Sequence, residues 1–236
     1  MELIFATNNS NKLHEVREKL KLIHSNIQIK SLAEIGFFDE IPETGTTFHA
    51  NALQKAQTVY DFCRRRGVLH TPPSNDCQNE RMQYARTVNC FADDSGLEID
   101  ALNGAPGVYS AMYAEMERGK GGARPALTFD DNINLVLQKL HGKTNRRANF
   151  KTVIALILKG TDYKSAPAIH YFEGRVDGEI LTEKRGTEGF GYDPIFRPDG
   201  YKETFAELPL DEKNRISHRG RAVDSLVAFL NHLHTT

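Results

Sequence analysis

The sequence contains no tryptophan and only three cysteines, Cys63, Cys77 and Cys90. An odd number of cysteines without CxxC spacing supports neither a disulfide framework nor a zinc site, so reduced thiols in a cytoplasmic protein are expected. The sequence also lacks any apolar run near the roughly 20 residues that span a bilayer, so no membrane partner is expected. No internal repeat or low-complexity segment is present.

Neither sign of charge is in excess. Lysine and arginine number 30, aspartate and glutamate 31, and the net charge is −1. This balance implies no broad basic surface and argues against long nucleic acid as a partner. A small anionic ligand held by a few local cations is compatible with it. With 236 residues and 39% hydrophobic content, the sequence indicates one large globular domain or two lobes sharing a core.

The most informative stretch is residues 91–101, Phe-Ala-Asp-Asp-Ser-Gly-Leu-Glu-Ile-Asp-Ala. Two apolar residues precede Asp93 and Asp94, and Leu97 and Ile99 then alternate with acids, which predicts a strand, a tight turn and a second strand. Adjacent carboxylates at a strand end repel one another, so a cation should share the site. Mg²⁺ held by one or two carboxylates and substrate phosphates would fit. The alternative is an ordinary aspartate-rich turn with local backbone hydrogen bonds.

A second polar stretch follows the apolar run 3–6, which predicts a buried strand. This polar stretch leads into a helix for which Ser10 or Asn11 is the expected N-cap. A strand that feeds a polar loop onto a helix N-terminus is a natural anion site. The side chains that would complete a phosphate cradle are Thr7, Asn8, Asn9 and Lys12. The Gly-x4-Gly-Lys pattern is absent, so this is not a Walker A loop, and plain capping of the helix is the alternative.

A helix is predicted to begin at Thr46 or Thr47, with a buried stripe formed by Phe48, Ala52, Ala56 and Val59. Lys55 lies close to this stripe, so it either snorkels from the edge of the core or points into a cleft. Glu43 comes just before the helix and either reaches a metal ion or lies in a solvated loop.

The remaining pattern predicts an α/β fold on a mixed sheet, because strand-like and helix-like segments are interspersed. Residues 153–158 form a continuous apolar run typical of a central strand, residues 169–172 and 176–181 suggest two further strands, and residues 130–140 suggest an amphipathic helix. Residues 64–89, which contain three arginines and a Pro-Pro pair, are expected to form an exposed excursion within the domain.

A third polar stretch, Gly-Thr-Glu-Gly-Phe-Gly-Tyr-Asp-Pro at residues 186–194, places three glycines around an aromatic and an acid. Glycines let the backbone approach a ligand closely. Phe190 offers a ring on which a base can stack, an interaction worth roughly 1–3 kcal/mol, and Asp193 can accept a hydrogen bond from a ring N–H. The alternative is a tight loop with Phe190 in the core.

Downstream, Lys213, Ser217 and His218 are expected to share one side of a helix. Lys213 and Arg219 can donate hydrogen bonds but cannot accept them. They therefore suit the keto oxygen of a purine better than the amino group of adenine.

Together these stretches resemble the inosine/xanthosine triphosphate pyrophosphatase family, which clears noncanonical purine nucleotides. The matching segments occur in the family's order, and the ordered set is far more specific than any one of them. They are residues 6–12, 43–45, 51–52, 55–56, 92–97, 104–107, 189–194 and 216–220.

The resemblance implies a two-lobed α/β fold with a cleft between the lobes, a homodimer, and Mg²⁺-dependent hydrolysis of ITP, dITP and XTP to the monophosphate and pyrophosphate. It implies that Glu43 and Asp94 bind Mg²⁺ and that Asp94 orients or deprotonates the attacking water. Residues implied to hold the triphosphate are Thr7, Asn8, Asn9, Lys12 and Lys55, with Ser95 beside the substrate. Residues implied to contact the base are Phe190, which stacks on it, and Gly191, Tyr192, Asp193, Lys213, His218 and Arg219.

The sequence departs from the family pattern at two single positions. Ala50 stands where the family often has glutamate, and Met112 replaces a common arginine; the excursion at 64–89 is also longer than usual. Two other functions fit the same residues: a nucleotide-binding sensor without turnover, and a pyrophosphatase of related fold that acts on pyrimidine or modified nucleotides.

Overall fold

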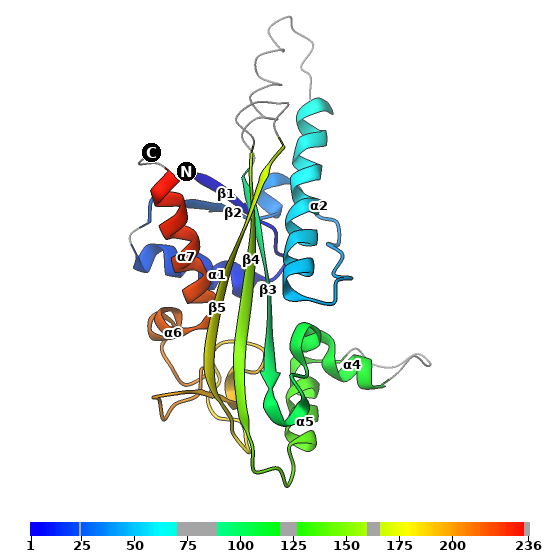
Figure 1. Cartoon of the computed structure of the whole chain (residues 1–236), viewed down its shortest axis with the longest axis vertical. Helices are drawn as coiled ribbons and strands as arrows, with labels where there is room; N and C mark the ends of the chain where they lie inside the picture. Colours follow the sequence, from blue (N-terminus) through cyan, green and yellow to red (C-terminus); the bar gives the residue numbers. More distant parts are fainter. Residues whose placement is uncertain (24, 70–88, 119–126, 160–165, 234–236) are drawn as a thin grey trace, which may run out of the picture. The chain divides into compact units, whose positions relative to one another are not determined.

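The computed structural model describes residues 1–23, 25–69, 89–118, 127–159 and 166–233 (Figure 1). The chain forms two compact units. Unit 1 comprises residues 1–94, 153–172 and 226–236, and unit 2 comprises residues 95–152 and 173–225. The chain therefore passes between the units several times, and three strands and the last helix contribute residues to both.

The strands form one six-stranded sheet in the order β2-β1-β3-β4-β5-β6. β1 pairs in parallel with both β2 and β3, whereas β5 and β6 are antiparallel. The sheet is therefore mixed, which confirms the predicted α/β class. The strands are β1 (Glu2–Phe5), β2 (Gln28–Lys30), β3 (Cys90–Ile99), β4 (Arg147–Leu158), β5 (Ala168–Ile180) and β6 (Phe196–Pro198).

Helices flank the strands in each unit. In unit 1, α2 lies on one side of the strands, and α1 with the unit 1 part of α7 lies on the other (Figure 1). The α-helices are α1 (Ser10–Leu22), α2 (Phe48–Leu69), α4 (Tyr113–Arg118), α5 (Phe129–Lys139), α6 (Leu210–Ile216) and α7 (His218–Leu233). Short 3₁₀ helices are η1 (Ala33–Ile35), η2 (Asp100–Leu102), η3 (Gly107–Met112) and η4 (Asp193–Ile195).

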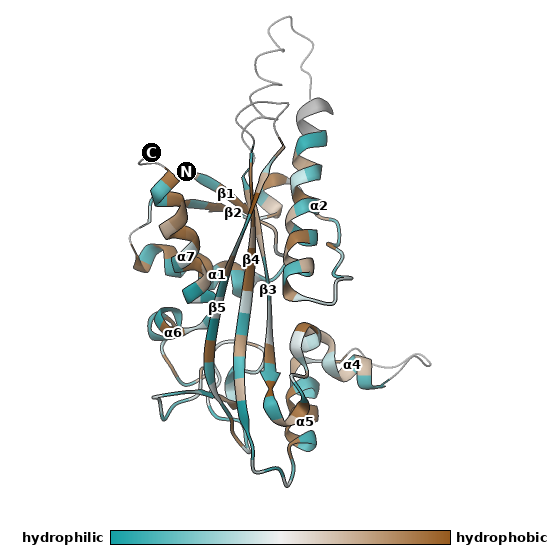
Figure 2. Cartoon of the chain, in the orientation of Figure 1, coloured by the Kyte–Doolittle hydropathy of each residue, from teal (hydrophilic) through white to brown (hydrophobic). Residues whose placement is uncertain are grey.

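Each unit has its own core. In unit 1 the part of β4 from Val153 to Ile157 is completely buried, as predicted for a central strand covered on both faces, and Figure 2 shows it as hydrophobic along its length. The predicted stripe of α2 is also confirmed, because Ala52, Ala56 and Val59 are fully buried. In unit 2 the core gathers side chains from β3, β4, β5 and α5, together with aromatic residues such as Phe196 and Phe205.

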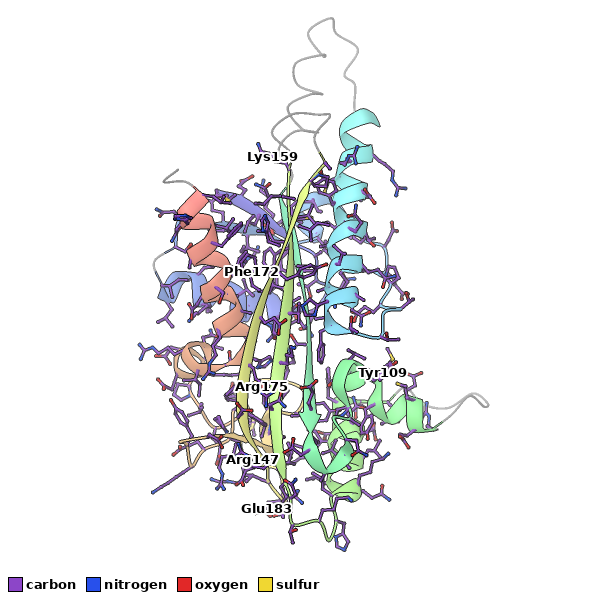
Figure 3. The ribbon with its side chains drawn as sticks, in the orientation of Figure 1. Tyr109, Arg147, Lys159, Phe172, Arg175 and Glu183 are labelled. Atoms are coloured by element: carbon purple, nitrogen blue, oxygen red, sulfur yellow. The ribbon has the colours of Figure 1, made fainter. Side chains whose placement is uncertain are left out.

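Two ion pairs of unit 2 involve arginines on its strands. Figure 3 shows Arg147 on β4 and Arg175 on β5. Both guanidinium groups form ion pairs with neighbouring carboxylates, Arg147 with Asp199 and Arg175 with Asp177, each at 2.7 Å. These pairs are largely exposed, so they contribute little to stability.

The predicted turn at residues 93–96 is wrong, because β3 runs without interruption from Cys90 to Ile99. Asp93 and Asp94 lie within the strand, where lysines neutralise both carboxylates. Gly96 serves close packing and not a turn, since a Cβ there would overlap the carbonyl oxygen of Gly107.

The two strands predicted at 169–172 and 176–181 are one strand, β5. Gly174, which lies between the two predicted strands, is part of β5 and lets the backbone of α7 approach, because a Cβ on it would overlap the carbonyl oxygen of His218. The predicted excursion also begins too early: residues 64–69 continue α2, Asn89 lies directly before β3, and residues 70–88 lie outside the described residues.

In the described part of the chain, no helix is both long enough and apolar enough to cross a bilayer. Cys90 is a buried free thiol, Cys63 is half-buried in α2, and Cys77 lies outside the described residues.

Candidate functional site

The acidic pair of β3 is buried and paired with two lysines of unit 1. Lys12, in the first turn of α1, forms an ion pair with Asp93, with Nζ 3.0 Å from Oδ1. Lys55, in α2, forms an ion pair with Asp94, with Nζ 3.2 Å from Oδ1. Two helices far apart in sequence therefore each bring one cation to neighbouring carboxylates, so four of the residues named from the sequence lie together.

Asp94 is the centre of this cluster. Its Oδ2 accepts a hydrogen bond from Asn51 Nδ2 at 3.1 Å, and its Oδ1 faces Lys55. Asn51 Oδ1 in turn accepts from the backbone N–H of Gly45 at 2.7 Å. Sequence analysis placed Asn51 only within a matching segment; the structure shows that this buried amide ties Asp94 to the loop that carries Glu43.

The electrostatics of Asp94 and Lys55 follow from their burial. Burial raises the pKa of the Asp94 carboxyl above its ordinary value, and the charges of Lys55 and Lys12 with the hydrogen bond from Asn51 offset only part of this. Burial alone would lower the pKa of Lys55, but the carboxylates of Asp94, Asp93 and Glu43 outweigh it and raise that pKa. Both groups thus bind a proton more tightly than they would in water.

The two residues predicted to bind a metal contact the same lysine. Glu43 Oε1 and Asp94 Oδ1 each lie 3.2 Å from Lys55 Nζ, so in this structure both carboxylates pair with one ammonium group. Among the described residues, no group of three or more histidine, cysteine, aspartate or glutamate side chains could enclose a metal ion. Two carboxylates completed by substrate oxygens suit Mg²⁺, which retains several waters and usually binds in this way.

The loop before α1 is held by its own side chains. Asn9 is the N-cap, in place of the predicted Ser10 or Asn11, and its Oδ1 accepts from the N–H groups of Asn11 and Lys12 at 3.0 and 3.2 Å. Thr7 Oγ1 accepts from the N–H of Asn9 at 3.2 Å, and Asn8 is exposed. This internal bonding gives the loop a fixed shape at the N-terminus of a 13-residue helix.

A second cluster lies in unit 2 around Phe190. The Lys213 ammonium lies 5.2 Å from the centre of the Phe190 ring, and the Arg219 guanidinium carbon lies 5.5 Å from it. Both distances are within the range of cation–π attraction. Two donor-only groups therefore gather beside the ring on which a base is predicted to stack.

Asp193 holds this cluster together. Its Oδ2 accepts from Lys213 Nζ at 2.7 Å and from the backbone N–H of Phe190 at 2.8 Å. Gly189 has φ +76°, and a Cβ at this residue would overlap Asp193 Oδ2. Gly191 also has positive φ, at +64°. The glycines on each side of Phe190 thus permit the turn, and the hydrogen bonds to Asp193 stabilise it.

Two predicted base-contacting residues are part of the unit 2 core. Tyr192 is buried and its hydroxyl donates to the carbonyl oxygen of Ser110 at 2.9 Å, while burial raises its pKa. His218 is buried and stacks on Phe150, with ring centres 4.7 Å apart and planes 10° from parallel. α6 ends at Ile216, so Lys213 and His218 lie on different helices, not on one as predicted.

Ser95, the first residue of unit 2 in β3, lies beside Arg219. Arg219 Nη2 donates to Ser95 Oγ at 3.2 Å, and Thr152 Oγ1 lies 2.7 Å from the same oxygen. Sequence analysis did not identify Thr152. The only local sign was a threonine at the start of a fully apolar run, which strand packing alone would also explain.

The two departures from the family pattern, Ala50 and Met112, are both exposed. The predicted residues thus separate into a phosphate and metal group in unit 1 and a base group in unit 2. That both groups face one cleft stays a prediction.

Comparison with known proteins agrees with the resemblance found in the sequence. The Ham1 family model matches residues 3–229. A curated dITP/XTP pyrophosphatase of Flavobacterium johnsoniae is 43% identical over 230 residues, with 98% of each chain covered. One of Bacillus subtilis is 41% identical, with 97% of this chain and 96% of the relative covered. A solved HAM1 protein from Coxiella burnetii is 37% identical with a TM-score of 0.69, covering 98% of this chain and 99% of that one. The resemblance found in the sequence is confirmed, and the chain belongs to the Ham1 family.

Proposed function

We propose that this protein is a nucleoside triphosphate pyrophosphatase that hydrolyses ITP, dITP and XTP to the monophosphate and pyrophosphate. The observation that carries the proposal is Asp94, a buried carboxylate held by Lys55 and Asn51 and next in sequence to Ser95 of the base group. The relatives from F. johnsoniae and B. subtilis are both named dITP/XTP pyrophosphatases, which supports the same activity.

In the proposed reaction, water attacks the α-phosphorus of the nucleotide. A bond forms between the water oxygen and this phosphorus, and the bond from the phosphorus to the oxygen that bridges to the β-phosphate breaks. Asp94 accepts the proton of the water. Its raised pKa favours that role, because a carboxylate that binds a proton more tightly is a stronger general base.

The lysines supply positive charge where negative charge accumulates. Lys12 and Lys55 already lie against carboxylates in unit 1, so both are held in place before a triphosphate arrives. Preorganised cations stabilise the developing charge of the leaving pyrophosphate without reorganisation during the reaction. The loop formed by Thr7, Asn8 and Asn9 lies at the N-terminus of α1, where the positive end of the helix dipole would favour the remaining phosphate oxygens.

Glu43 and Asp94 would hold Mg²⁺, because both carboxylates lie within 3.2 Å of the Lys55 ammonium and Mg²⁺ is usually bound by one or two carboxylates together with phosphate oxygens and water. When bound, the ion would act as a Lewis acid on the phosphate oxygens.

The base would stack on Phe190 while Lys213 and Arg219 donate to its keto oxygens. Asp193 keeps the loop and Lys213 in place, and Tyr192 and His218 anchor the same region from the core. Adenine carries an amino group where hypoxanthine carries a keto oxygen, so donor-only side chains disfavour it.

Pyrophosphate release from ITP, XTP, GTP, ATP and dTTP, measured side by side with Mg²⁺, tests the proposal. We expect ITP and XTP to be preferred. Asp94→Asn should abolish turnover and retain nucleotide binding, whereas Asp39→Asn, at an exposed loop position, should keep full activity. Binding of ITP without turnover by the unchanged protein would indicate a sensor, and preference for dTTP would indicate a pyrimidine or modified-nucleotide enzyme.

We also propose that the protein works as a homodimer in the cytoplasm. The buried free thiol of Cys90 is compatible with a reducing compartment. Light scattering coupled to size-exclusion chromatography tests the dimer, and a monomeric mass at micromolar concentration would contradict it.

A further inference from the structure

Thr152 is a completely buried polar residue of unit 2 that none of the roles described so far explains. It lies in β4, and its Oγ1 is 2.7 Å from Ser95 Oγ in β3. Threonine is β-branched, so its χ1 angle is restricted, whereas serine rotates more freely. The Thr152 hydroxyl group is therefore the more rigid of the two. It sets the orientation of the Ser95 hydroxyl group.

The orientation of the Ser95 hydroxyl group in turn affects the position of Arg219. Arg219 Nη2 donates to Ser95 Oγ at 3.2 Å. A guanidinium group can only donate, so the serine oxygen must turn a lone pair toward it. A hydroxyl group that also bonds to Thr152 has only a narrow range of rotations that serve both partners.

Arg219 then reaches the ring of the base group. Its guanidinium carbon lies 5.5 Å from the centre of the Phe190 ring, within cation–π distance. The contacts form one connected path from Thr152 through Ser95 and Arg219 to Phe190, and every residue of it belongs to unit 2.

We infer that Thr152 is a positioning residue that holds Arg219 over Phe190 through Ser95 and thereby sets the affinity for the purine base. The inference rests on the proposed function, since it assumes that the base lies at Phe190. Base contacts are remote from the reacting α-phosphorus and are made equally in the ground and transition states. Loss of such a contact raises KM and leaves kcat nearly unchanged.

The test compares Thr152→Val, which keeps the shape and removes the hydroxyl group, with Thr152→Ser, which keeps the hydroxyl group. We expect Thr152→Val to raise the KM for ITP about 3- to 10-fold, as the loss of one hydrogen bond implies, with kcat within about twofold. Thr152→Ser should restore the KM. Thr58→Val is the matched control, because the Thr58 hydroxyl donates to the carbonyl oxygen of Gln54 within α2 of unit 1, whereas Thr152 and the base group belong to unit 2.

A double-mutant cycle shows whether Thr152 acts through Ser95. In a Ser95→Ala background, Thr152→Val should have no further effect on KM. Additive effects would overturn the inference, and so would an unchanged KM or a loss confined to kcat. If the unchanged protein releases no pyrophosphate from ITP, the proposed function fails by itself; calorimetric affinities for ITP then replace KM in the same comparison.

Discussion

The Lys213 ammonium lies 2.7 Å from Asp193 Oδ2, and both side chains are only 4% exposed. Because the same oxygen also accepts from the N–H of Phe190, this one ion pair fixes both a cation and the backbone of the loop proposed to bind the base. Its removal therefore has consequences for stability as well as for binding.

We expect Asp193→Asn to lower the free energy of unfolding by about 3–5 kcal/mol, because it removes the carboxylate charge that pairs with the buried Lys213 ammonium. Lys213→Met in the same chain should recover much of that loss. Arg147→Gln, which breaks an ion pair with about half-exposed partners, should cost less than about 1 kcal/mol. Urea unfolding measures all three, and equal losses for the buried and exposed pairs would contradict the expectation.

Asn51→Leu should affect both the position of Asp94 and the loop that carries Glu43. The substitution removes the buried donor to Asp94 and the partly buried acceptor for the Gly45 N–H. We expect a loss of about 1–3 kcal/mol in unfolding free energy for the unpaired groups, together with a kcat reduced at least tenfold. Steady-state kinetics and urea unfolding on one preparation separate the two effects; wild-type kcat would show that Asn51 does not position Asp94.

Gly96→Ala should be destabilising although Gly96 lies in an ordinary strand conformation. The added methyl group would overlap the Gly107 carbonyl oxygen and approach Ser110 Oγ, so the backbone must move, at a cost of about 1–3 kcal/mol. Gly142→Ala is the matched control: its φ is +72°, but nothing lies within 4 Å of the new methyl group. Its cost should be about 1 kcal/mol, from the left-handed conformation alone. A larger cost at Gly142 than at Gly96 would be the contrary result.

Glu34 should titrate far below an ordinary glutamate. Hydrogen bonds from the Ser31 hydroxyl and N–H, with a smaller contribution from Arg17, lower the pKa of Glu34 to about 2 from 4.5. Since the folded-state pKa is the lower one, the stabilisation is fully present above about pH 4.5 and is lost as the pH falls toward about 2. Carboxyl NMR titration measures the pKa directly.

Glu34→Gln provides the matching stability measurement. Unfolding curves of this variant and of the unchanged protein should converge as the pH falls through the same window. A difference in unfolding free energy that is constant from pH 6 to about pH 2 would contradict the assigned pKa.

The elements that the sequence predicted correctly are those whose burial is encoded locally. The stripe of α2 repeats at helical spacing, and the apolar run of β4 is continuous, so each pattern can be recognised without knowledge of any neighbour. Both are buried as expected.

The errors arose where a distant residue decides the local structure. Asp-Asp-Ser-Gly is typical of a turn, yet it lies within β3 because Lys12 and Lys55, from two separate helices, pair with the acids. Thr152 and Ser95 are 57 residues apart, so no spacing rule links them. For the same reason the sequence named Lys213 and Asp193 as ligands of the base but did not reveal that they bind each other.

The uninterrupted course of β3 also limits how this chain can change in length. Asp94 and Ser95 are consecutive, and successive side chains of a strand point to opposite faces. A single inserted or deleted residue here would exchange the inward and outward faces of everything that follows in the strand, including Leu97. Evolution can lengthen or shorten surface loops, but this segment of β3 can accept substitutions only.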